Sequence, residues 1–586
     1  MNSHYTTERN VQILISVLKA NNIKNVVASP GTTNICFIAS IQQDPFFNIY
    51  SAPDERSAGY IACGMAAETG EPVVISCTGA TASRNYMPAL TEAYYRKLPI
   101  LAITSSRRSS KIGHNYDQVT DRTQLPKDIA KLSVQMPVVL DADNEWAVNI
   151  AANKAVLELN HRGKGPVHIN LETDYSRIYD VKDLPTTRII KRFTQRNSLP
   201  KIKASRICIF VGAHSEWSEK LTQYVDKFCS QHNAIVLCDH VSNYKGKYRA
   251  FANFHAIQRD FSSVMLNADL LIHIGDIAAS CYSVNTKEVW RVNEDGEIRD
   301  PFHKLTNVFE MTEEDFFAAY TNEESNGTSL DFWNEYSKEE NQIRPLLNEK
   351  LKDFPFSNAW MASQTAKNLP QNAVLHLGIQ NSLRFWNFFD VPNSVLGYCN
   401  TGGFGIDGPL STVIGAALAS PQKIHYVVLG DLAFFYDFNS LGNRHLPKNI
   451  RILLVNNGRG TEFKLTGNPG AMFGDDADKY IAAAGHYGHK SKDLVKHYAE
   501  DLGFKYYSAE TKDEYLSIKD KFLSTESTSP ILLEAFTNSE DENQALTLIS
   551  TSVTTPIKTM IREMKDFTRK TVGERGTKFL TNLMGK

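Results

Sequence analysis

The 586-residue chain lacks the marks of several specialised protein classes. Its eight cysteines are scattered, without a CxxC pair or dense spacing, which argues against a disulfide scaffold or a cysteine-rich zinc site. No stretch approaches the roughly 20 apolar residues that span a bilayer. Residues 1–9 show neither the basic region nor the apolar core of a secretory signal. We therefore expect a cytoplasmic protein with reduced thiols.

An excess of charge of one sign is also lacking. Lys and Arg number 63 against 65 Asp and Glu, so the net charge is only -2, and neither nucleic acid nor an anionic membrane is an expected partner. A P-loop, a Ser-His-Asp pattern and a dinucleotide fingerprint are not found. Apolar residues (42%) and charged residues (22%) are balanced as in ordinary globular proteins, and the length calls for more than one core.

Apolar strands alternate with helix-like segments through most of the chain, which predicts an α/β protein with three consecutive doubly wound parallel-sheet domains. The polar stretch 183–203 reads as a linker, and the charged helical stretch 330–352 separates the second domain from the third. The predicted domains are residues 1–182, 204–330 and 353–550. Strands are expected at residues 25–28, 73–76, 100–103, 207–212, 270–275, 373–377, 424–429 and 450–455.

Residues 551–586 form a separate tail in this prediction. The tail carries eight Lys and Arg against three Asp and Glu, and apolar side chains recur in it at helical spacing. We expect an amphipathic C-terminal helix. Docking on its own protein or on a sister subunit is favoured over a role at a membrane surface.

Two polar turns follow neighbouring strands of the third domain, residues 430–432 (Gly-Asp-Leu) and 456–458 (Asn-Asn-Gly). Parallel strands expose their carboxyl ends on one edge of the sheet, so Asp431 and Asn457 can meet there. Their oxygens suit Mg²⁺, and a helix that opens after Gly430 can receive a diphosphate through Leu432 and Ala433. Each turn alone would be an ordinary turn. Together they resemble the thiamine diphosphate (ThDP) motif, with Leu432 in place of its last glycine.

A second signal is the run of small residues 54–67, which predicts a closely packed helix with Glu55 at its start. The helix dipole alone explains an acidic residue at that position. In the functional interpretation, Glu55 lies in a dry pocket and donates a hydrogen bond to a heteroaromatic nitrogen of a cofactor. Burial favours the protonated form that this role needs.

Several segments together resemble the menaquinone-pathway SEPHCHC synthases, which belong to the ThDP-dependent 2-oxo acid decarboxylases and carboligases. The resemblance extends to about Leu548 and leaves the tail unmatched, and the Gly-Ile-Asp-Gly run with its Leu-Ser-Thr is its most specific part. The segments are residues 52–104, 289–301, 378–383, 402–412 and 430–457.

The resemblance implies a catalytic role for Glu55, which protonates the aminopyrimidine ring, with Gln118 as second catalytic residue. It implies Mg²⁺ ligands at Asp431, at Asn457 and at the backbone carbonyl of Arg459. Members build each site from the first domain of one subunit and the third domain of another, so a homodimer or homotetramer is implied. The expected cofactor contacts are Thr78, Gly79, Ala80, Ile406, Gly430, Leu432 and Ala433.

The chain departs from the family where substrate is expected to bind. Family members have arginines where Thr33, Trp386 and Thr401 stand here, while Arg107 matches and Arg384 is displaced by two positions. A threonine or tryptophan cannot replace the charge-assisted bonds of a guanidinium. The candidate substrate contacts are Thr33, Arg107, Ser382, Arg384, Trp386 and Thr401.

Three functions remain open. The favoured one is a ThDP- and Mg²⁺-dependent enzyme that decarboxylates a 2-oxo acid and joins the product to a small-molecule acceptor, with substrates other than the family's pair. The second is a genuine SEPHCHC synthase, which joins the succinyl semialdehyde unit of 2-oxoglutarate to isochorismate. The third is an inactive scaffold protein, against which the presence of Glu55, Asp431 and Asn457 together argues.

Overall fold

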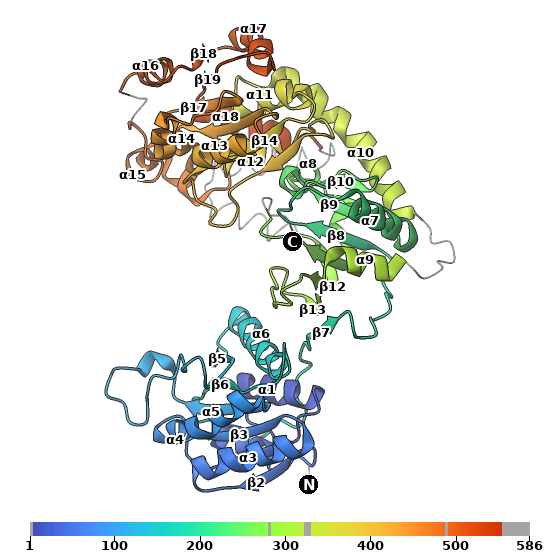
Figure 1. Cartoon of the computed structure of the whole chain (residues 1–586), viewed down its shortest axis with the longest axis vertical. Helices are drawn as coiled ribbons and strands as arrows, with labels where there is room; N and C mark the ends of the chain where they lie inside the picture. Colours follow the sequence, from blue (N-terminus) through green and yellow to red (C-terminus); the bar gives the residue numbers. More distant parts are fainter. Residues whose placement is uncertain (1–3, 279–282, 322–329, 487–489, 554–586) are drawn as a thin grey trace, which may run out of the picture. The chain divides into compact units, whose positions relative to one another are not determined.

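The computed structural model describes residues 4–278, 283–321, 330–486 and 490–553. Its internal contacts divide the chain into two compact units, residues 1–199 with 295–310 and residues 200–294 with those after 310. Within them lie three parallel sheets covered by helices (Figure 1), so the predicted α/β class is confirmed. The exact bounds of the three predicted domains stay a prediction, and the proposed tail helix lies outside the described residues from 554 onward.

The first unit is built on a six-stranded parallel sheet of order β2-β1-β3-β4-β6-β5. Apolar side chains alternate between its faces, so Val26 and Val74 pack with α1, α2 and α6 while Val27 and Ile75 pack with α3, α4 and α5. The strands are β1 (Asn25–Ala28), β2 (Asn48–Ser51), β3 (Val73–Thr78), β4 (Ile100–Ser106), β5 (Leu132–Met136) and β6 (Val167–Glu172). The helices are α1 (Arg9–Ala20), α2 (Ile35–Ile41), α3 (Glu55–Thr69), α4 (Thr81–Asn85), α5 (Met87–Arg96) and α6 (Ala142–Glu158).

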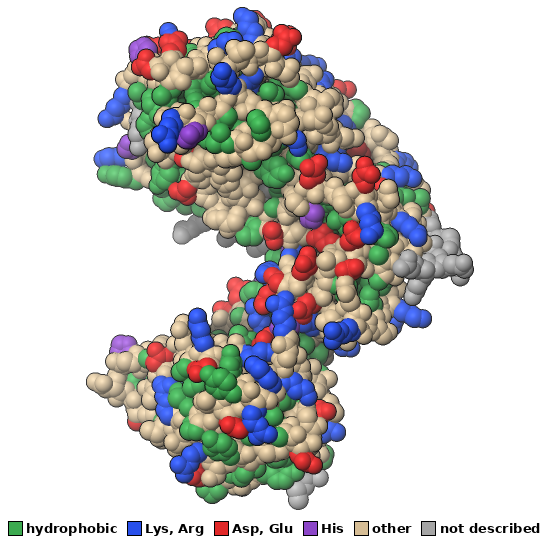
Figure 2. All heavy atoms as spheres, in the orientation of Figure 1, with side chains coloured by type: hydrophobic (Ala, Val, Ile, Leu, Met, Phe, Trp, Pro, Cys, Tyr) green, Lys and Arg blue, Asp and Glu red, His purple; other side chains and the backbone are tan. Residues whose placement is uncertain are grey.

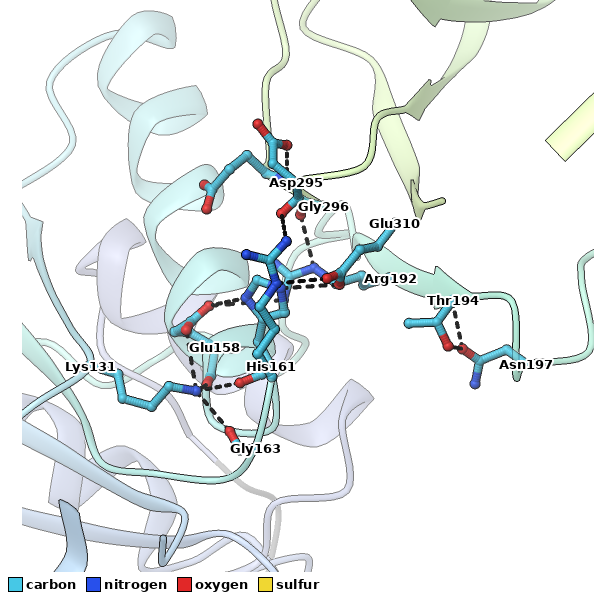
Figure 3. A network of polar contacts seen from close by, with 12 residues as sticks. Lys131, Glu158, His161, Gly163, Arg192, Thr194, Asn197, Asp295, Gly296 and Glu310 are labelled. Carbon is cyan, nitrogen blue, oxygen red and sulfur yellow. Dashed lines mark hydrogen bonds and ion pairs between the residues drawn. The ribbon is translucent and has the colours of Figure 1, made fainter. Parts of the chain in front are cut away.

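The stretch predicted as a linker contains a strand, β7 (Lys191–Thr194), which pairs in parallel with β13 (Leu305–Glu310). A polar cluster ties this strand pair to the end of α6 (Figure 3). His161 lies between two carboxylates, with its Nδ1 2.8 Å from Glu158 Oε2 and its Nε2 3.1 Å from Glu310 Oε2, and Arg192 Nε donates to the carbonyl of Gly296 (2.9 Å). The linker prediction was wrong at these four residues because the strand's partner lies more than a hundred residues later.

The second unit begins with five parallel strands in the order β10-β9-β8-β11-β12. The strands are β8 (Ile207–Val211), β9 (Ala234–Cys238), β10 (Arg249–Phe251), β11 (Asn267–Ile274) and β12 (Asn285–Val292). The helices are α7 (Glu219–His232), α8 (Asn253–Ala256), α9 (Glu313–Thr321) and the long α10 (Asp331–Lys350), which leads to the last sheet.

The last sheet has six parallel strands in the order β15-β14-β16-β17-β19-β18. Its strands are β14 (Val374–Leu377), β15 (Leu396–Tyr398), β16 (His425–Gly430), β17 (Ile450–Asn456), β18 (Lys505–Ala509) and β19 (Ile531–Phe536). Its helices are α11 (Asn358–Thr365), α12 (Asn381–Trp386), α13 (Pro409–Ala419), α14 (Asp431–Asp437), α15 (Ala477–Tyr480), α16 (Leu494–Asp501), α17 (Lys512–Leu523) and α18 (Ser539–Ser550).

Charge on the surface is mixed, as the near-zero net charge predicts. On the face shown in Figure 2, acidic and basic side chains are interspersed, and no broad region of one sign stands out. In the part of the chain that the structure describes, no helix has the length and apolar character needed to traverse a bilayer.

Candidate active site

The two polar turns of the third predicted domain meet at one edge of the last sheet. Strands β16 and β17 are paired in parallel with Gly430 opposite Val455, so Asp431 and Asn457 each follow the carboxyl end of a strand. Helix α14 begins at Asp431 directly after β16, as the sequence predicts. The Asp431 carboxylate accepts the N–H of Leu432 (2.9 Å). The N–H groups of Gly458 and Arg459 are also close enough to lower the pKa of this carboxyl.

These side chains fit a divalent cation. Asp431 is buried, and burial raises the pKa of its carboxyl to about 7 although the surrounding N–H groups lower it. The Oδ1 atom of Asn457 is buried and accepts no hydrogen bond from the described residues. A desolvated carboxylate beside an unused amide oxygen lacks a positive partner, and Mg²⁺ prefers oxygen ligands of this kind. The carbonyl of Arg459, the third predicted ligand, accepts the N–H of Thr461 (2.8 Å).

A narrow pocket lies on the same edge of the sheet. It brings together Ile406, the residue expected beneath the cofactor, and Ala433 of α14, with Gly378, Ile379 and Asn400 also in its wall. Gly430 is the residue that precedes α14. The structure thus places four of the predicted cofactor and metal residues within one short stretch around the start of α14: Gly430, Asp431, Leu432 and Ala433.

The predicted residues of the first unit gather at the carboxyl ends of its sheet. Glu55 is the first residue of α3, whose N-cap Asp54 accepts the N–H groups of Arg56 (2.9 Å) and Ser57 (3.3 Å). Asn85 Nδ2 donates to Glu55 Oε2 (3.1 Å). The Glu55 side chain is half-exposed among the described residues of this unit, so the unit by itself does not form the dry pocket that the role of Glu55 calls for.

The turn Thr78-Gly79-Ala80 links the end of β3 to α4. Thr33 is buried, and its Oγ1 bonds to Thr78 Oγ1 and to the carbonyl of Ser105 (2.5 Å). Gln118 is exposed and has a left-handed backbone (φ 57°) in the long segment between β4 and β5. Thr33 is therefore part of the wall behind the turn, and Gln118 is presented at the surface of the unit.

The basic side chains proposed to bind substrate already have carboxylate partners. Arg107 Nη2 donates to Asp117 (2.9 Å), and its guanidinium lies over the ring of Tyr175 at 5.2 Å. Arg384 makes a two-point ion pair with Glu462, at 2.6 and 2.9 Å. Arg384 is thus held by two contacts with one carboxylate, whereas Arg107 is held by a single contact through Nη2.

Three other substrate candidates are buried. Trp386 is 1% exposed, and its indole N–H donates to Asn358 Oδ1 (3.0 Å). Asn358 also donates to Ser382 Oγ (3.3 Å), and Thr401 is 6% exposed. Trp386 thus belongs to the core of the last sheet, with almost no surface left for a substrate.

Sequence reasoning missed Arg122 and Glu462. Arg122 is buried behind the turn at Gly79, and Glu462 neutralises Arg384. Neither residue lies in a recognisable pattern, so the sequence offered no signal for either.

Comparison with known proteins identifies the family. Residues 9–125 match the model described as "Thiamine pyrophosphate enzyme, N-terminal TPP binding domain". The 2-succinyl-5-enolpyruvyl-6-hydroxy-3-cyclohexene-1-carboxylate (SEPHCHC) synthase of Bacteroides thetaiotaomicron is 30% identical over 92% of this chain and 98% of its own length. The chain belongs to the SEPHCHC synthase family.

Other SEPHCHC synthases agree. The Phocaeicola vulgatus protein is 31% identical over 92% of this chain and 98% of its own length, and the Flavobacterium johnsoniae protein is 26% identical over 90% and 95%. As a member of the SEPHCHC synthase family, the chain is a ThDP-dependent enzyme, which confirms the class predicted from the two polar turns and Glu55.

Proposed function

We propose that this enzyme uses ThDP and Mg²⁺ to decarboxylate a 2-oxo acid and to form a C–C bond with an acceptor, and that its substrates carry fewer carboxylates than 2-oxoglutarate and isochorismate. The proposed use of ThDP and Mg²⁺ is supported by the buried carboxyl of Asp431 and by the Asn457 amide oxygen, which accepts no hydrogen bond from the described residues. The observation that carries the substrate part is the pairing of Arg384 with Glu462 and of Arg107 with Asp117.

In this proposal Asp431 and Asn457 hold Mg²⁺ by their side chains. Glu55 donates a proton to the pyrimidine ring, and Ile406 and Ala433 shape the pocket wall. Bound ThDP would supply the nucleophile and the electron sink that loss of CO₂ from a 2-oxo acid requires. With Thr33, Trp386 and Thr401 at the positions where family members carry arginines, the substrate region lacks three positive charges, which suits a donor with a single carboxylate.

We also propose that the working form is a homodimer or homotetramer, as the family resemblance implies. Helix α3, which begins at Glu55, exposes Tyr60 and Ile61, each 47% accessible. Covering this apolar surface with another subunit would also remove Glu55 from water. Sedimentation equilibrium tests the assembly, and a monomer at all concentrations would contradict it. A cytoplasmic location stays a prediction.

A genuine SEPHCHC synthase is the second candidate, supported by the near full-length match to proteins of that name. It requires that substrate carboxylates bind Arg107 and Arg384 beside or in place of Asp117 and Glu462.

The deciding experiment is CO₂ release by the purified enzyme from a panel of 2-oxo acids, with ThDP and Mg²⁺, with and without acceptor aldehydes or acids. We expect ThDP-dependent release from at least one donor, lost in Asp431→Ala. Absence of release from every donor, by an enzyme that binds ThDP, would contradict the proposed function in favour of a scaffold.

A further inference from the structure

Arg122 is a deeply buried charged residue of the first unit. It is 1% exposed and lies in the irregular segment between β4 and β5, four residues after Gln118. All of its hydrogen-bond acceptors are neutral. Its Nη1 donates to the carbonyls of Gly79 and Thr120 (3.4 Å to the latter), its Nε donates to Thr104 Oγ1 (3.2 Å), and its Nη2 donates to Asn170 Oδ1.

The charge of Arg122 is not balanced by an ion pair with any described residue. The carboxylate of the neighbouring Asp121 accepts instead from the N–H (3.0 Å) and Oγ1 (2.7 Å) of Thr123. Burial lowers the pKa of Arg122 to about 10, in line with a desolvated cation. A buried charge without a counter-ion costs folding stability, and an apolar side chain could fill the same space without that cost. Packing alone therefore does not account for an arginine here.

A polar network on one face of the sheet prepares the site of Arg122. Thr104, Asn170 and Gln135 stand opposite one another on β4, β6 and β5, and Asn170 Nδ2 donates to Gln135 Oε1 (2.6 Å). His168 bridges Thr104 Oγ1 and Ser133 Oγ, at 2.7 Å to each. Burial, with the charge of Arg122 as a further cause, lowers the pKa of His168 to about 3, so this ring is neutral. These hydrogen bonds hold the two acceptors of Arg122 on the sheet, Thr104 and Asn170, in place.

Away from the sheet, the guanidinium of Arg122 contacts the turn at Gly79. The guanidinium covers Gly79 so closely that a β-carbon at this position would lie 2.2 Å from Nη1 and 2.4 Å from Cζ. Thr120 Oγ1 donates to the same Gly79 carbonyl (2.9 Å). Two residues of the segment that carries Gln118, Thr120 and Arg122, thus donate to one carbonyl of the turn between Thr78 and Ala80. A side chain at Gly79 would displace the guanidinium of Arg122 from its present position.

We propose that Arg122 is a positioning residue, which clamps the Gln118 segment onto the Thr78-Gly79-Ala80 turn and so sets the two loops that face the cofactor. This inference rests on the proposed function, since it takes that turn as part of the ThDP site. The side chain is too deeply buried to touch substrate itself. Its effect passes through the Gly79 carbonyl, and supporting hydrogen bonds of this kind hold a site in its productive geometry.

The test compares three single variants of the full-length holoenzyme. Arg122→Met keeps the length and removes the charge, and Arg122→Lys keeps the charge and loses the planar fork. Arg84→Met is the matched control, because the exposed Arg84 donates to the carbonyl of Asp121 (2.7 Å) and so holds the same segment without touching Gly79. For each we would measure the melting temperature, the Kd for ThDP with Mg²⁺ by calorimetry, and kcat and KM for CO₂ release at saturating ThDP.

At an assay temperature well below the melting temperature of the variant, we expect Arg122→Met to raise the Kd for ThDP about tenfold or more and to lower kcat about tenfold or more. The change in KM should be smaller. Arg122→Lys should lie between this variant and the wild type, and Arg84→Met should stay within about twofold of wild type. A folded Arg122→Met with wild-type Kd and kcat would overturn the proposal and leave Arg122 a purely structural residue.

If Arg122→Met does not fold, Arg122→Lys and Thr120→Val decide, because each removes only part of the grip on Gly79. Wild-type Kd and kcat in both variants would overturn the proposal, and a raised Kd together with a lowered kcat would support it.

The calorimetric Kd separates the positioning role of Arg122 from the proposed function. A wild type that releases no CO₂ but whose ThDP affinity depends on Arg122 would refute the proposed function and leave the clamp standing.

Discussion

Glu542 in the first turn of α18 is linked through Asn358 to two of the predicted substrate residues, Ser382 and Trp386. It is 1% exposed, and its carboxyl accepts the N–H of Asn358 (2.9 and 3.1 Å) and the hydroxyl of Thr537 (3.0 Å). Asn358 in turn bonds to Ser382 and Trp386. Burial raises the pKa of Glu542 from 4.5 to about 7, against the lowering effect of these hydrogen bonds.

This pKa makes part of the protein's stability depend on pH. Because the folded state favours the protonated carboxyl, this contribution is present below about pH 4.5 and is lost as the pH rises through about 7. The difference between the two pKa values corresponds to about 3 kcal/mol at most. About 2 kcal/mol of that loss falls between about pH 5.5 and about pH 8.5.

The change Glu542→Gln removes the titration and keeps one acceptor oxygen for Asn358. Relative to wild type, the variant should gain about 2 kcal/mol in the free energy of unfolding when the pH is raised from about 5.5 to about 8.5. Urea unfolding at both pH values measures this, with the exposed Glu540→Gln in the same helical turn as control. A difference from wild type that stays the same at both pH values would refute the reasoning.

Three further predictions concern the cofactor site and the middle of the chain. ThDP should bind only with a divalent cation, so calorimetry in EDTA should show lost affinity that Asp431→Ala reproduces, and equal affinity with and without EDTA would refute the metal site. Glu55→Gln should keep most ThDP affinity but lose exchange of the cofactor's C2 proton, followed by NMR, and unchanged exchange would refute its role. Burial lowers the pKa of His255, but its hydrogen bonds to Glu339 and Glu340 raise it on balance. Wild type should therefore lose stability relative to His255→Gln as the pH rises above about 6.5, which urea unfolding measures, and a constant difference would contradict this.

Local patterns sufficed for the strands and for the position of the two polar turns at one edge of the last sheet. Strands such as Asn25–Ala28 were predicted to the residue because a short apolar run bounded by turns is legible within a few positions. Asp431 and Asn457 could be paired because parallel neighbouring strands bring their carboxyl ends together wherever the rest of the chain goes.

The missed features depend on contacts between distant residues. Arg384, a candidate substrate arginine, is paired with Glu462, 78 positions later, and no local pattern indicates this partner. On α12, Arg384 is two positions from both Ser382 and Trp386, and this spacing turns it to the opposite side of the helix. The burial of Arg122 and the strand β7 likewise depend on partners that no local window contains.

The substrate preference is the part of the account that distinguishes this enzyme from its relatives. A hydrogen bond to a charged group contributes about 1.5 to 3 kcal/mol, so a site without three carboxylate-binding arginines forfeits several kcal/mol, and every 1.4 kcal/mol is about tenfold in rate or affinity. The decisive measurement is kcat/KM at matched concentrations for pyruvate and other monocarboxylic 2-oxo acids against 2-oxoglutarate plus isochorismate. The account predicts that a monocarboxylic donor is used at least as well as 2-oxoglutarate with isochorismate. A kcat/KM for 2-oxoglutarate plus isochorismate far above all others would contradict it and make the chain a SEPHCHC synthase in function as well as in family.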